Sequence, residues 1–376
     1  AVLTNDKALL AACKRLWRSV TLKRMHITGG IGPNPRNEGF TADYDLPSQR
    51  AYLETCATIG LLLWAQRLLH AEKDGRYADV VERALYNGTI SGVSADGKTF
   101  FYGNPLAAHP GFDGNGRYVD EGFHYRRSEW FGCACCPPNI ARLIAQIPTL
   151  LYSYAAGALY VHQYAASTAR AGVGPDVVEL TQKTDYPWNG RIRLSVTPSR
   201  PATWTLALRI PGWCRCATLR VNGRPVKADQ VMRKGYACIR RRWAKGDRVE
   251  LVLPMVPERI EAHPSARQTV GRVALQRGPI VYCLEQADNG ANLAEIALPR
   301  TAKLSARRDS DLPSRAVVIT ARGKRPKHDR RNRALYRPAG AKGPATTSVP
   351  IKAIPYFLWA HRTPGEMLTW IRDVPG

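Results

Sequence analysis

Three of the nine cysteines of this chain fall within four positions, at Cys133, Cys135 and Cys136. An odd number of cysteines in a chain of 376 residues does not suggest a disulfide framework. Adjacent Cys135 and Cys136 could form only a strained disulfide with each other, whereas neighbouring thiolates in a loop can share a metal ion. The cysteine pattern therefore predicts metal binding or cysteine-based catalysis.

A carboxylate and a further thiol could complete such a site. Glu54 and Cys56 lie two residues apart in a stretch with helical hydrophobic spacing. Zinc favours thiolate, imidazole and carboxylate ligands in a tetrahedral set, and these two residues with Cys135 and Cys136 would supply one oxygen and three sulfur atoms. Because residues two apart on a regular helix do not share a face, Glu54 and Cys56 must lie at a helix entrance or a bend.

The residues after the cysteine pair favour ionised thiols. Pro137 and Pro138 suit the first turn of a helix that continues from Asn139. The free N–H groups and the positive dipole end of that helix would face the cysteines, while Pro137 disfavours a helical conformation of Cys136. A nearby cation and a helix N-terminus both depress the pKa of a thiol, so Cys135 could be ionised at neutral pH, with activation coming from the metal.

Simpler explanations compete with these assignments. A cysteine-rich zinc site in a helical domain is more often structural than catalytic, and spacing alone favours that interpretation. Glu38, in a loop of Gly, Pro and Asn, could be a solvated carboxylate, and Glu82, on a predicted helix, could be a surface charge. Cys214 and Cys216 lie in a β context without a matching second pair, so no metal is assigned to them.

The elements that would position these residues change character along the chain. Hydrophobic spacing predicts helices over residues 51–72, 77–87 and 139–154, separated by glycine-rich loops over 26–44 and 95–127. From Gly157 onward, apolar residues alternate with polar ones, and Pro, Gly and Asn divide the chain into short segments. The sequence thus predicts a helical first part followed by antiparallel β-sandwiches, with a second β unit after Pro257.

Composition limits the expected partners. The formal net charge is +25, but the basic residues are scattered, and their densest run, residues 321–333, has the Pro and Gly content of a solvated loop. No nucleic-acid-binding module accompanies the charge, and no stretch is long and apolar enough for a membrane span. Unpaired thiols fit a reducing cytoplasm. Because the chain starts without Met, we expect it to be a fragment or a processed product.

Several motifs together resemble glycoside hydrolase family 127, the β-L-arabinofuranosidases. They include MHITGGIG from Met25, NEGF from Asn37, the ETC motif from Glu54, ERALYNG from Glu82 and CACCPPN from Cys133. In the β part, LRIPGWC, LQRGPIVYCLE and AIPYFLWAHRTPGEMLTWIR look like segments of that family. The resemblance implies a multidomain α + β chain: the C-terminal part of an (α/α)6 barrel over residues 1–153, then antiparallel β-sandwich domains over 154–258 and 259–376.

The resemblance also implies roles for individual residues. Four positions match the family's zinc ligands: Glu54, Cys56, Cys135 and Cys136. Cys135 matches the nucleophile and Glu38 the general acid/base, while Glu82 and Tyr102 match positions that contact the sugar. Residues that the family draws from the first half of its barrel have no counterpart in this chain, so its sugar site would be incomplete.

The implied reaction is a retaining hydrolysis of β-L-arabinofuranosides in an oligosaccharide or glycan, which departs from the usual pair of carboxylates. Glu38 would protonate the leaving oxygen while the Cys135 sulfur attacks the anomeric carbon, and Glu38 would then activate a water. Two alternatives stay open: a glycosidase acting on another plant-type or pectic sugar, and a non-catalytic carbohydrate-binding fragment with a structural zinc. A homodimer also stays open, whereas no nucleic-acid or membrane partner is implied.

Overall fold

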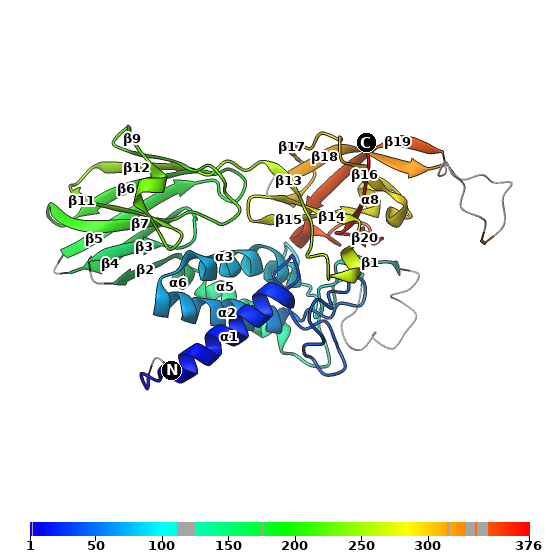
Figure 1. Ribbon diagram of the computed structural model, residues 1–376, viewed down its shortest axis with the longest axis horizontal. Coiled ribbons are helices and arrows are strands. Elements are labelled where there is room, and N and C mark those ends of the chain that lie inside the picture. Colours follow the sequence, from blue (N-terminus) through cyan, green and yellow to red (C-terminus); the bar gives the residue numbers. More distant parts are fainter. Residues whose placement is uncertain are drawn as a thin grey trace.

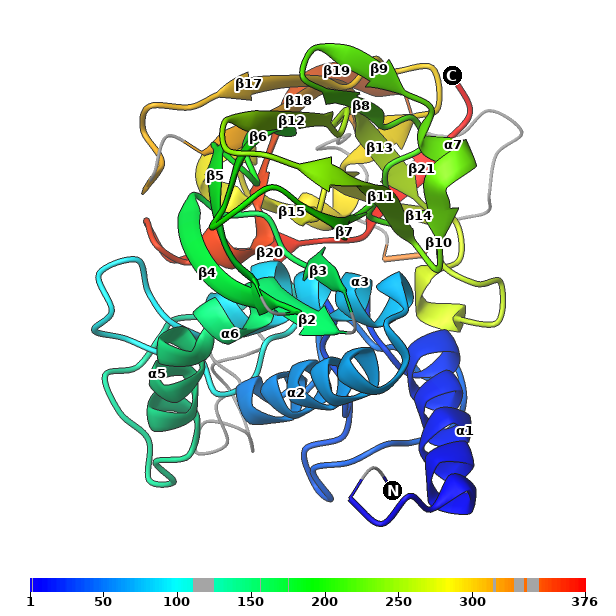
Figure 2. The same ribbon diagram turned by 90° about the vertical axis from the view of Figure 1, so that its left-hand side faces the viewer.

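The computed structural model describes residues 1, 3–110, 125–155, 157–174, 176–313, 316–327, 335–336 and 345–376. The chain is a multidomain α + β protein with a helical part and two β regions (Figures 1 and 2). In Figure 1 the helices lie along the lower side of the molecule, and the two β regions lie next to each other above them. Among the described residues, no helix is long and apolar enough to cross a membrane.

The helical part, the described residues up to 151, is built around a core of large apolar side chains that includes Trp17, Leu62 and Leu143. Its α-helices are α1 (Lys7–Lys23), α2 (Thr55–Glu72), α3 (Gly75–Arg83), α5 (Cys136–Gln146) and α6 (Pro148–Leu151). Helix α3 continues into a π-helical turn over Ala84–Thr89 and a 3-10 turn over Ile90–Gly92. Asp6 and Asp74 cap α1 and α3 with their carboxylates, as Asp does at helix N-termini.

Several helix boundaries differ from those predicted by periodicity. Helix α2 begins at Thr55, because Tyr52 pairs through its backbone with Pro33 and Asn104 and Leu53 has a left-handed φ of +44°. The predicted helix over 139–154 begins at Cys136 and gives way to a strand at Tyr152. Helix α1 was not predicted at all, although its sequence carries an N-cap at Asp6.

The middle β region is a sandwich of two sheets, as predicted, but it is not wholly antiparallel, because β3 (Ala158–Val161) pairs in parallel with β7 (Ala202–Arg209). A five-stranded sheet has the order β10-β11-β7-β3-β2, and a six-stranded sheet the order β4-β5-β6-β12-β8-β9. Trp204, Trp243 and Leu251 belong to the buried core between them. The strands are β2 (Tyr152–Ala155), β3 (Ala158–Val161), β4 (Ser167–Val173), β5 (Asp176–Thr184), β6 (Arg191–Pro198), β7 (Ala202–Arg209), β8 (Thr218–Val221), β9 (Arg224–Val226), β10 (Met232–Arg233), β11 (Tyr236–Trp243) and β12 (Asp247–Val252).

The C-terminal β region is one ten-stranded sheet, in which β15 pairs with both β14 and β19 so that the sheet closes on itself. This differs from two separate sheets, because short strands such as β16 and β21 link its two sides. The strands are β13 (Pro257–Ile260), β14 (Arg272–Arg277), β15 (Ile280–Glu285), β16 (Ala297–Pro299), β17 (Ser305–Arg308), β18 (Val317–Pro326), β19 (Thr346–Pro355), β20 (Met367–Leu368), β21 (Ile371–Val374) and, from the helical part, β1 (Ala107–Ala108).

The basic run over residues 321–333 was predicted to be a solvated loop, and this is wrong for its first part. Residues 321–326 belong to β18, which pairs with β19 over Ile319–Pro326. Positive side chains on an edge or exposed face do not prevent strand pairing, because successive side chains point to opposite faces. Residues 328–333 lie outside the described part of the chain.

Both β regions pack against the helical part. Ala207 and Tyr236 of the five-stranded sheet belong to the same buried cluster as α2 and α3. On the other side, Phe101 stacks on Trp359 of the C-terminal β region with ring centroids 4.6 Å apart. Both β regions therefore cover one side of the helical part, the upper side in Figure 1.

Candidate metal and active site

The four predicted metal ligands come together in the structure. One ligand atom from each of Glu54, Cys56, Cys135 and Cys136 lies within 4.8 Å of all the others. The Sγ atoms of Cys56 and Cys136 are 3.5 Å apart, and those of Cys135 and Cys136 are 3.7 Å apart. Oε1 of Glu54 lies 3.3 Å from Sγ of Cys135 and 3.6 Å from Sγ of Cys136. All nine cysteines are free thiols, so no disulfide competes for these sulfurs.

These distances agree with a tetrahedral zinc site. Bonds of about 2.3 Å to sulfur and about 2.1 Å to oxygen place tetrahedral sulfur ligands roughly 3.8 Å apart, and sulfur and oxygen roughly 3.6 Å apart. The observed separations of 3.3 to 3.7 Å fall close to both values. Three sulfurs and one oxygen also form a donor set that zinc favours over magnesium or calcium. The residues present therefore fit a zinc ion.

Two helix N-termini meet at this cluster. Glu54 is the N-cap residue of α2, so Cys56 lies in its first turn, and Cys135 is the N-cap residue of α5, which begins with Cys136. This confirms the prediction that Glu54 and Cys56 lie at a helix entrance. The prediction that Pro137 moves Cys136 out of the helix is wrong, because Pro137 and Pro138 occupy first-turn positions whose N–H groups need no partner. Both positive helix ends therefore face the sulfur atoms.

The thiols affect one another's ionisation. The hydrogen bond with Cys136 lowers the pKa of Cys56 to about 7. Burial raises the pKa of Cys135 to about 12, and the hydrogen bond with Cys56, together with burial, raises the pKa of Cys136. A divalent cation held by the four ligands would favour the thiolate form of all three sulfurs at neutral pH.

Two tyrosines connect this cluster to Glu38. The hydroxyl of Tyr52 donates a hydrogen bond of 3.2 Å to Oε1 of Glu38 and also hydrogen bonds to Tyr102. Oη of Tyr102 lies 3.0 Å from Sγ of Cys135. Asn104 donates to the carbonyl oxygen of Leu53 and to Thr55, which fixes the backbone on both sides of Glu54. The result is a polar chain from an exposed carboxylate to a half-buried thiol.

Glu38 lies in a tight loop that directs its side chain toward this chain of hydroxyls. Its φ is +48°, and Asn34 and Gly39 form an antiparallel bridge around it. A left-handed conformation is unfavourable for a residue with a Cβ and persists where the surroundings enforce it, often at functional sites. Oδ1 of Asn37 accepts a hydrogen bond from the N–H of Gly39 and helps to hold the loop.

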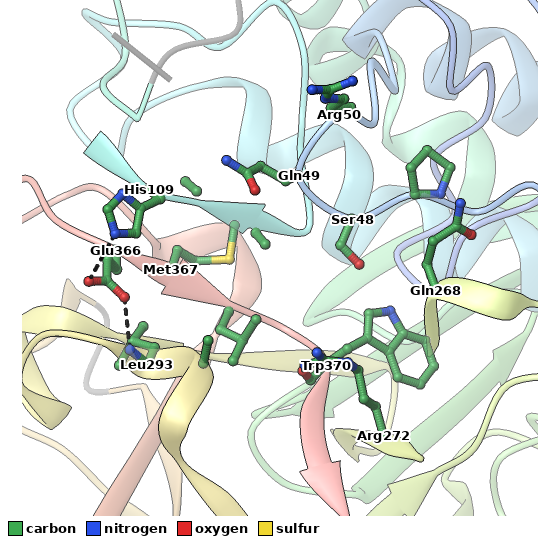
Figure 3. Close-up of a pocket in the computed structure, with 15 residues that line it drawn as sticks. Ser48, Gln49, Arg50, His109, Gln268, Arg272, Leu293, Glu366, Met367 and Trp370 are labelled. Carbon is green, nitrogen blue, oxygen red and sulfur yellow. Dashed lines mark hydrogen bonds and ion pairs between the residues drawn. The ribbon is translucent and has the colours of Figure 1, made fainter. Parts of the chain in front are cut away.

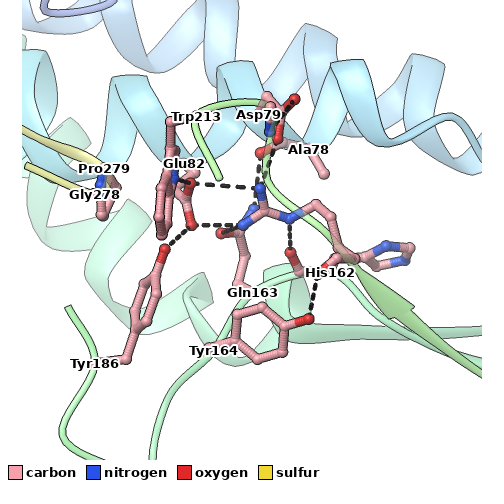
Figure 4. A network of polar contacts seen from close by, with 12 residues as sticks. Ala78, Asp79, Glu82, His162, Gln163, Tyr164, Tyr186, Trp213, Gly278 and Pro279 are labelled. Atoms are coloured by element: carbon pink, nitrogen blue, oxygen red, sulfur yellow. Dashed lines mark hydrogen bonds and ion pairs between the residues drawn. The ribbon is translucent and has the colours of Figure 1, made fainter. Parts of the chain in front are cut away.

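Glu82 lies elsewhere, in a buried network between α3 and the middle β region (Figure 4). Its Oε1 forms a 2.5 Å ion pair with Nη2 of Arg209, a fully buried residue. Trp213 donates a 3.0 Å hydrogen bond to Oε2, and the hydroxyl of Tyr186 donates to Oε1. Asp79 binds the other side of the Arg209 guanidinium at 2.7 Å. The structure thus gives Glu82 a role at a domain interface, and its predicted contact with the sugar stays a prediction.

Tyr52 is the site residue that sequence reasoning missed. It stands two positions before Glu54 in AYLETC, in a stretch whose apolar spacing predicts a helix. The structure begins that helix only at Thr55 and places Leu53 in a left-handed conformation, so no regular periodicity of the sequence relates Tyr52 to Glu54. Tyr52, Tyr102 and Cys136 form a small buried cluster with Cys56, Phe131 and Cys135 packed around it.

Models of three domains of one family match consecutive stretches of the chain. The β-L-arabinofuranosidase GH127 catalytic domain matches residues 1–149, the GH127 middle domain residues 158–255, and the glycoside hydrolase family 127 C-terminal domain residues 257–372. The chain belongs to glycoside hydrolase family 127. These matches agree with the resemblance found in the motifs and with the change from helices to strands near residue 152.

Relatives of this family 127 chain include characterised and solved proteins. The non-reducing end β-L-arabinofuranosidase of Bifidobacterium longum subsp. longum is 36% identical over 98% of the chain and 56% of its own length. A GH127 β-L-arabinofuranosidase from Geobacillus stearothermophilus T6 is 49% identical with a TM-score of 0.95, covering 99% of the chain and 58% of that structure. A second GH127 β-arabinofuranosidase is 37% identical with a TM-score of 0.89, covering 99% and 57%. The chain thus spans less than two thirds of these relatives.

A cavity of about 490 Å³ lies at the seam between the helical part and the C-terminal β region of this family 127 chain (Figure 3). Ser48 and Arg50 line it from one side, and Arg272 and Trp370 from the other. The segments that end in Glu54 and begin at Tyr102 also reach this cavity, since Tyr52 and Ser48 pair through their carbonyl oxygens with the N–H groups of residues 104 and 106. The same two chain segments therefore connect the cavity with the thiol cluster.

Proposed function

We propose that this chain is part of a retaining, zinc-dependent glycosidase that releases L-arabinofuranose from β-L-arabinofuranosides, with Cys135 as nucleophile and Glu38 as general acid/base. The observation that carries the proposal is the convergence of three thiols and Glu54 within 4.8 Å, connected to Glu38 through Tyr52 and Tyr102. A purely structural zinc site would have no need of an exposed carboxylate linked to one of its sulfurs.

The domain assignment belongs to the same proposal. Residues 1–153 form the C-terminal part of an (α/α)6 barrel that carries the site, and residues 154–258 and 259–376 form the two β domains. Helices α2 and α5 support this, because they deliver their N-terminal ends to one point, as the loops at one end of such a barrel would. The chain covers 56 to 58% of its relatives, which is the share expected if the rest of the barrel lies elsewhere in the whole protein.

The proposed reaction uses the four zinc ligands and Glu38. Glu54, Cys56, Cys135 and Cys136 would hold the zinc ion, which when bound keeps Cys135 ionised and makes it a better leaving group. The Cys135 sulfur forms a bond to the anomeric carbon as the glycosidic C–O bond breaks, and Glu38 gives its proton to the departing oxygen. Glu38 then takes a proton from water, the water oxygen bonds to the anomeric carbon, and the C–S bond breaks. Two displacements retain the configuration.

The neighbouring tyrosines position these groups. Tyr102, beside Cys135, can donate a hydrogen bond to the thiolate or to a sugar hydroxyl, in agreement with its predicted contact with the substrate. Tyr52 orients the Glu38 carboxyl. The cavity at the seam offers room for the part of the glycan beyond the cleaved sugar, because the two chain segments that form the site continue into it.

Hydrolysis of a β-L-arabinofuranoside by the full-length protein tests the proposal. Cys135→Ala and Glu38→Gln should each lower kcat by on the order of 10³-fold. Cys216→Ala, which changes an exposed thiol of the middle β region, serves as the matched control and should keep full activity. Full turnover by Cys135→Ala with zinc still bound would overturn the assignment of Cys135 as nucleophile. Zinc binding without any turnover by the unmodified full-length protein would instead support a structural zinc in a carbohydrate-binding protein.

A further inference from the structure

Basic side chains form a row on the outer face of the six-stranded sheet of the middle β region. Lys183 of β5 lies directly opposite Arg193 of β6, which in turn lies directly opposite Glu250 of β12. Glu250 is directly opposite Arg220 of β8. Adjacent strands are about 4.8 Å apart, so this row extends roughly 14 Å across the sheet. Arg248, opposite Ser195 in the neighbouring row, adds a fourth cation.

The single carboxylate of this row does not neutralise it. Oε1 of Glu250 forms a 2.5 Å ion pair with Arg191, at the end of β6. Among the described residues, none of the four cations (Lys183, Arg193, Arg220 and Arg248) is in an ion pair with a carboxylate. Like charges directly opposite each other, such as Lys183 and Arg193, destabilise a sheet. An anion bound across the row would remove that repulsion.

The face is also hollowed and free of packing by the described chain. A depression of about 480 Å³ is lined by the four cations together with Ser195, Gly223 and Glu250. The opposite face of the same sheet is the sandwich core, where Leu194 and Val249 are buried. The helical part packs on the other, five-stranded sheet through Ala207 and Tyr236. Figure 1 shows β6, β12 and β9 on the upper side of that region, away from the helices, while β5 lies lower, near β4.

We propose that this cationic row binds an anionic polysaccharide, with successive carboxylates of a uronic acid chain lying along Lys183, Arg193 and Arg220. The choice of a polysaccharide as the ligand rests on the proposed function, in which the helical part of the same chain acts on a glycan. A row of cations on successive strands suits a polymer with regularly repeated charges better than a single small anion. The binding site lies outside the catalytic site and would hold the enzyme on an acidic polymer that carries its neutral substrate.

The lining of the hollow disfavours other polyanions. Among the described residues, no aromatic side chain lines it, so this part of the chain offers no surface on which the bases of single-stranded nucleic acid could stack. Its apolar residues, Leu194 and Val249, are buried and cannot insert into a bilayer. Double-stranded DNA, which is bound through phosphates alone, is the remaining competitor and is included in the test.

The test measures binding of polygalacturonate, neutral arabinan and double-stranded DNA to the intact protein by affinity electrophoresis and calorimetry at low and moderate salt. Cys135→Ala is used as background, so binding is read without hydrolysis. Arg193→Gln with Arg248→Gln should weaken polygalacturonate binding about tenfold and reduce its salt dependence. Arg240→Gln with Arg242→Gln removes the same charge from exposed positions of β11 in the other sheet and should change affinity less than twofold.

Equal losses in the two double variants would overturn the proposal, because the effect would then be one of net charge. If double-stranded DNA, at the same concentration of negative charges, binds as tightly as polygalacturonate or more tightly, the proposal is overturned in favour of nucleic acid. All four arginines are exposed, so the variants should fold, which a melting curve checks. If the unmodified enzyme binds polygalacturonate through this face but does not hydrolyse arabinofuranosides, only the catalytic proposal fails.

Discussion

Oη of Tyr102 lies 3.0 Å from Sγ of Cys135, although 33 residues separate them in the chain. Nearly all of Tyr102 is buried, and its ring packs edge-on against Phe131 at 5.5 Å. Burial and the hydrogen bond with Cys135 raise the pKa of Tyr102, so its hydroxyl stays protonated and available as a donor. A phenol held in this way can stabilise a thiolate on the attacking sulfur and on the same sulfur when it leaves.

Tyr102→Phe should therefore lower kcat by about 10- to 100-fold while leaving zinc content unchanged, since the ring and its packing remain. Steady-state kinetics with a β-L-arabinofuranoside and metal analysis of the same sample measure both. Tyr154→Phe, at an exposed position in β2, is the control and should show wild-type rates. A kcat equal to that of the wild type would exclude Tyr102 from the reaction.

The metal site should contain one zinc ion per chain. Cys56→Ala removes a ligand that is not the nucleophile, and we expect zinc content to fall well below one and the melting temperature to drop, because metal binding free energy is also folding free energy. Cys133→Ala changes an exposed thiol outside the four-ligand set and should keep the zinc. Elemental analysis after dialysis measures the zinc content. Full zinc occupancy in Cys56→Ala would contradict the proposed ligand set.

Arg209 and Glu82 should hold the helical part on the middle β region. Arg209→Met leaves the Glu82 carboxylate buried without its counter-charge, which costs about 3 to 5 kcal/mol of unfolding free energy. The double variant Arg209→Met with Glu82→Leu should regain part of this loss, because the buried Glu82 charge is gone and only Asp79, whose side chain is one-third exposed, lacks its arginine partner. Urea unfolding measures all three proteins. Arg215→Met, at a largely exposed ion pair with Glu258, is the control and should unfold like the wild type.

The cavity at the seam gives a prediction that separates long from short substrates. Arg50 is exposed at its edge, and Arg50→Ala should raise KM several-fold for an arabino-oligosaccharide while leaving kinetics on a small aryl β-L-arabinofuranoside unchanged. Only the longer ligand reaches a side chain beyond the cleaved sugar. Equal effects on both substrates would show that Arg50 acts on the catalytic site itself.

The sequence predicted the ligand set but not the groups that connect it to Glu38. Metal ligands have distinctive residue types, and the spacing of Glu54 and Cys56 required a helix entrance, which the structure confirms. Tyr52 carries no such signature. Its role arises because residues 51–54 lie outside the helix, with Leu53 at a φ of +44°. That conformation depends on backbone pairing of Tyr52 with Pro33 and Asn104, which are distant in the chain.

Long-range pairing also explains the other differences. Glu82 looked like a surface charge or a sugar contact, because its partner Arg209 lies 127 residues further along the chain. Alternation correctly predicted strands after residue 157, but it contains no information on which strands pair, so the closure of the C-terminal sheet through β14 and β15 could not be foreseen. Local chemistry was therefore predictable, while the connections between domains were not.

Stability should fall in mild acid because two histidines are buried in the neutral form. Burial lowers the pKa of both His26 and His162 to about 3, whereas an unfolded histidine titrates near 6.5. Below pH 6.5 the two histidines bind protons in the unfolded state but not in the folded state. The unfolding free energy therefore decreases by about 1.4 kcal/mol for each histidine with every unit that the pH falls. Between pH 6.5 and 5 each should remove about 2 kcal/mol.

His162→Gln tests this, because glutamine can keep polar contacts with Ser153 and Tyr236, which lie 2.7 Å from the two ring nitrogens, but cannot titrate. The difference in unfolding free energy between pH 7 and pH 5 should shrink by about 2 kcal/mol relative to the wild type, whatever the variant's absolute stability. His263→Gln, at an exposed position, should leave that difference unchanged. An unaltered pH dependence in His162→Gln would mean that this imidazole accepts a proton without unfolding.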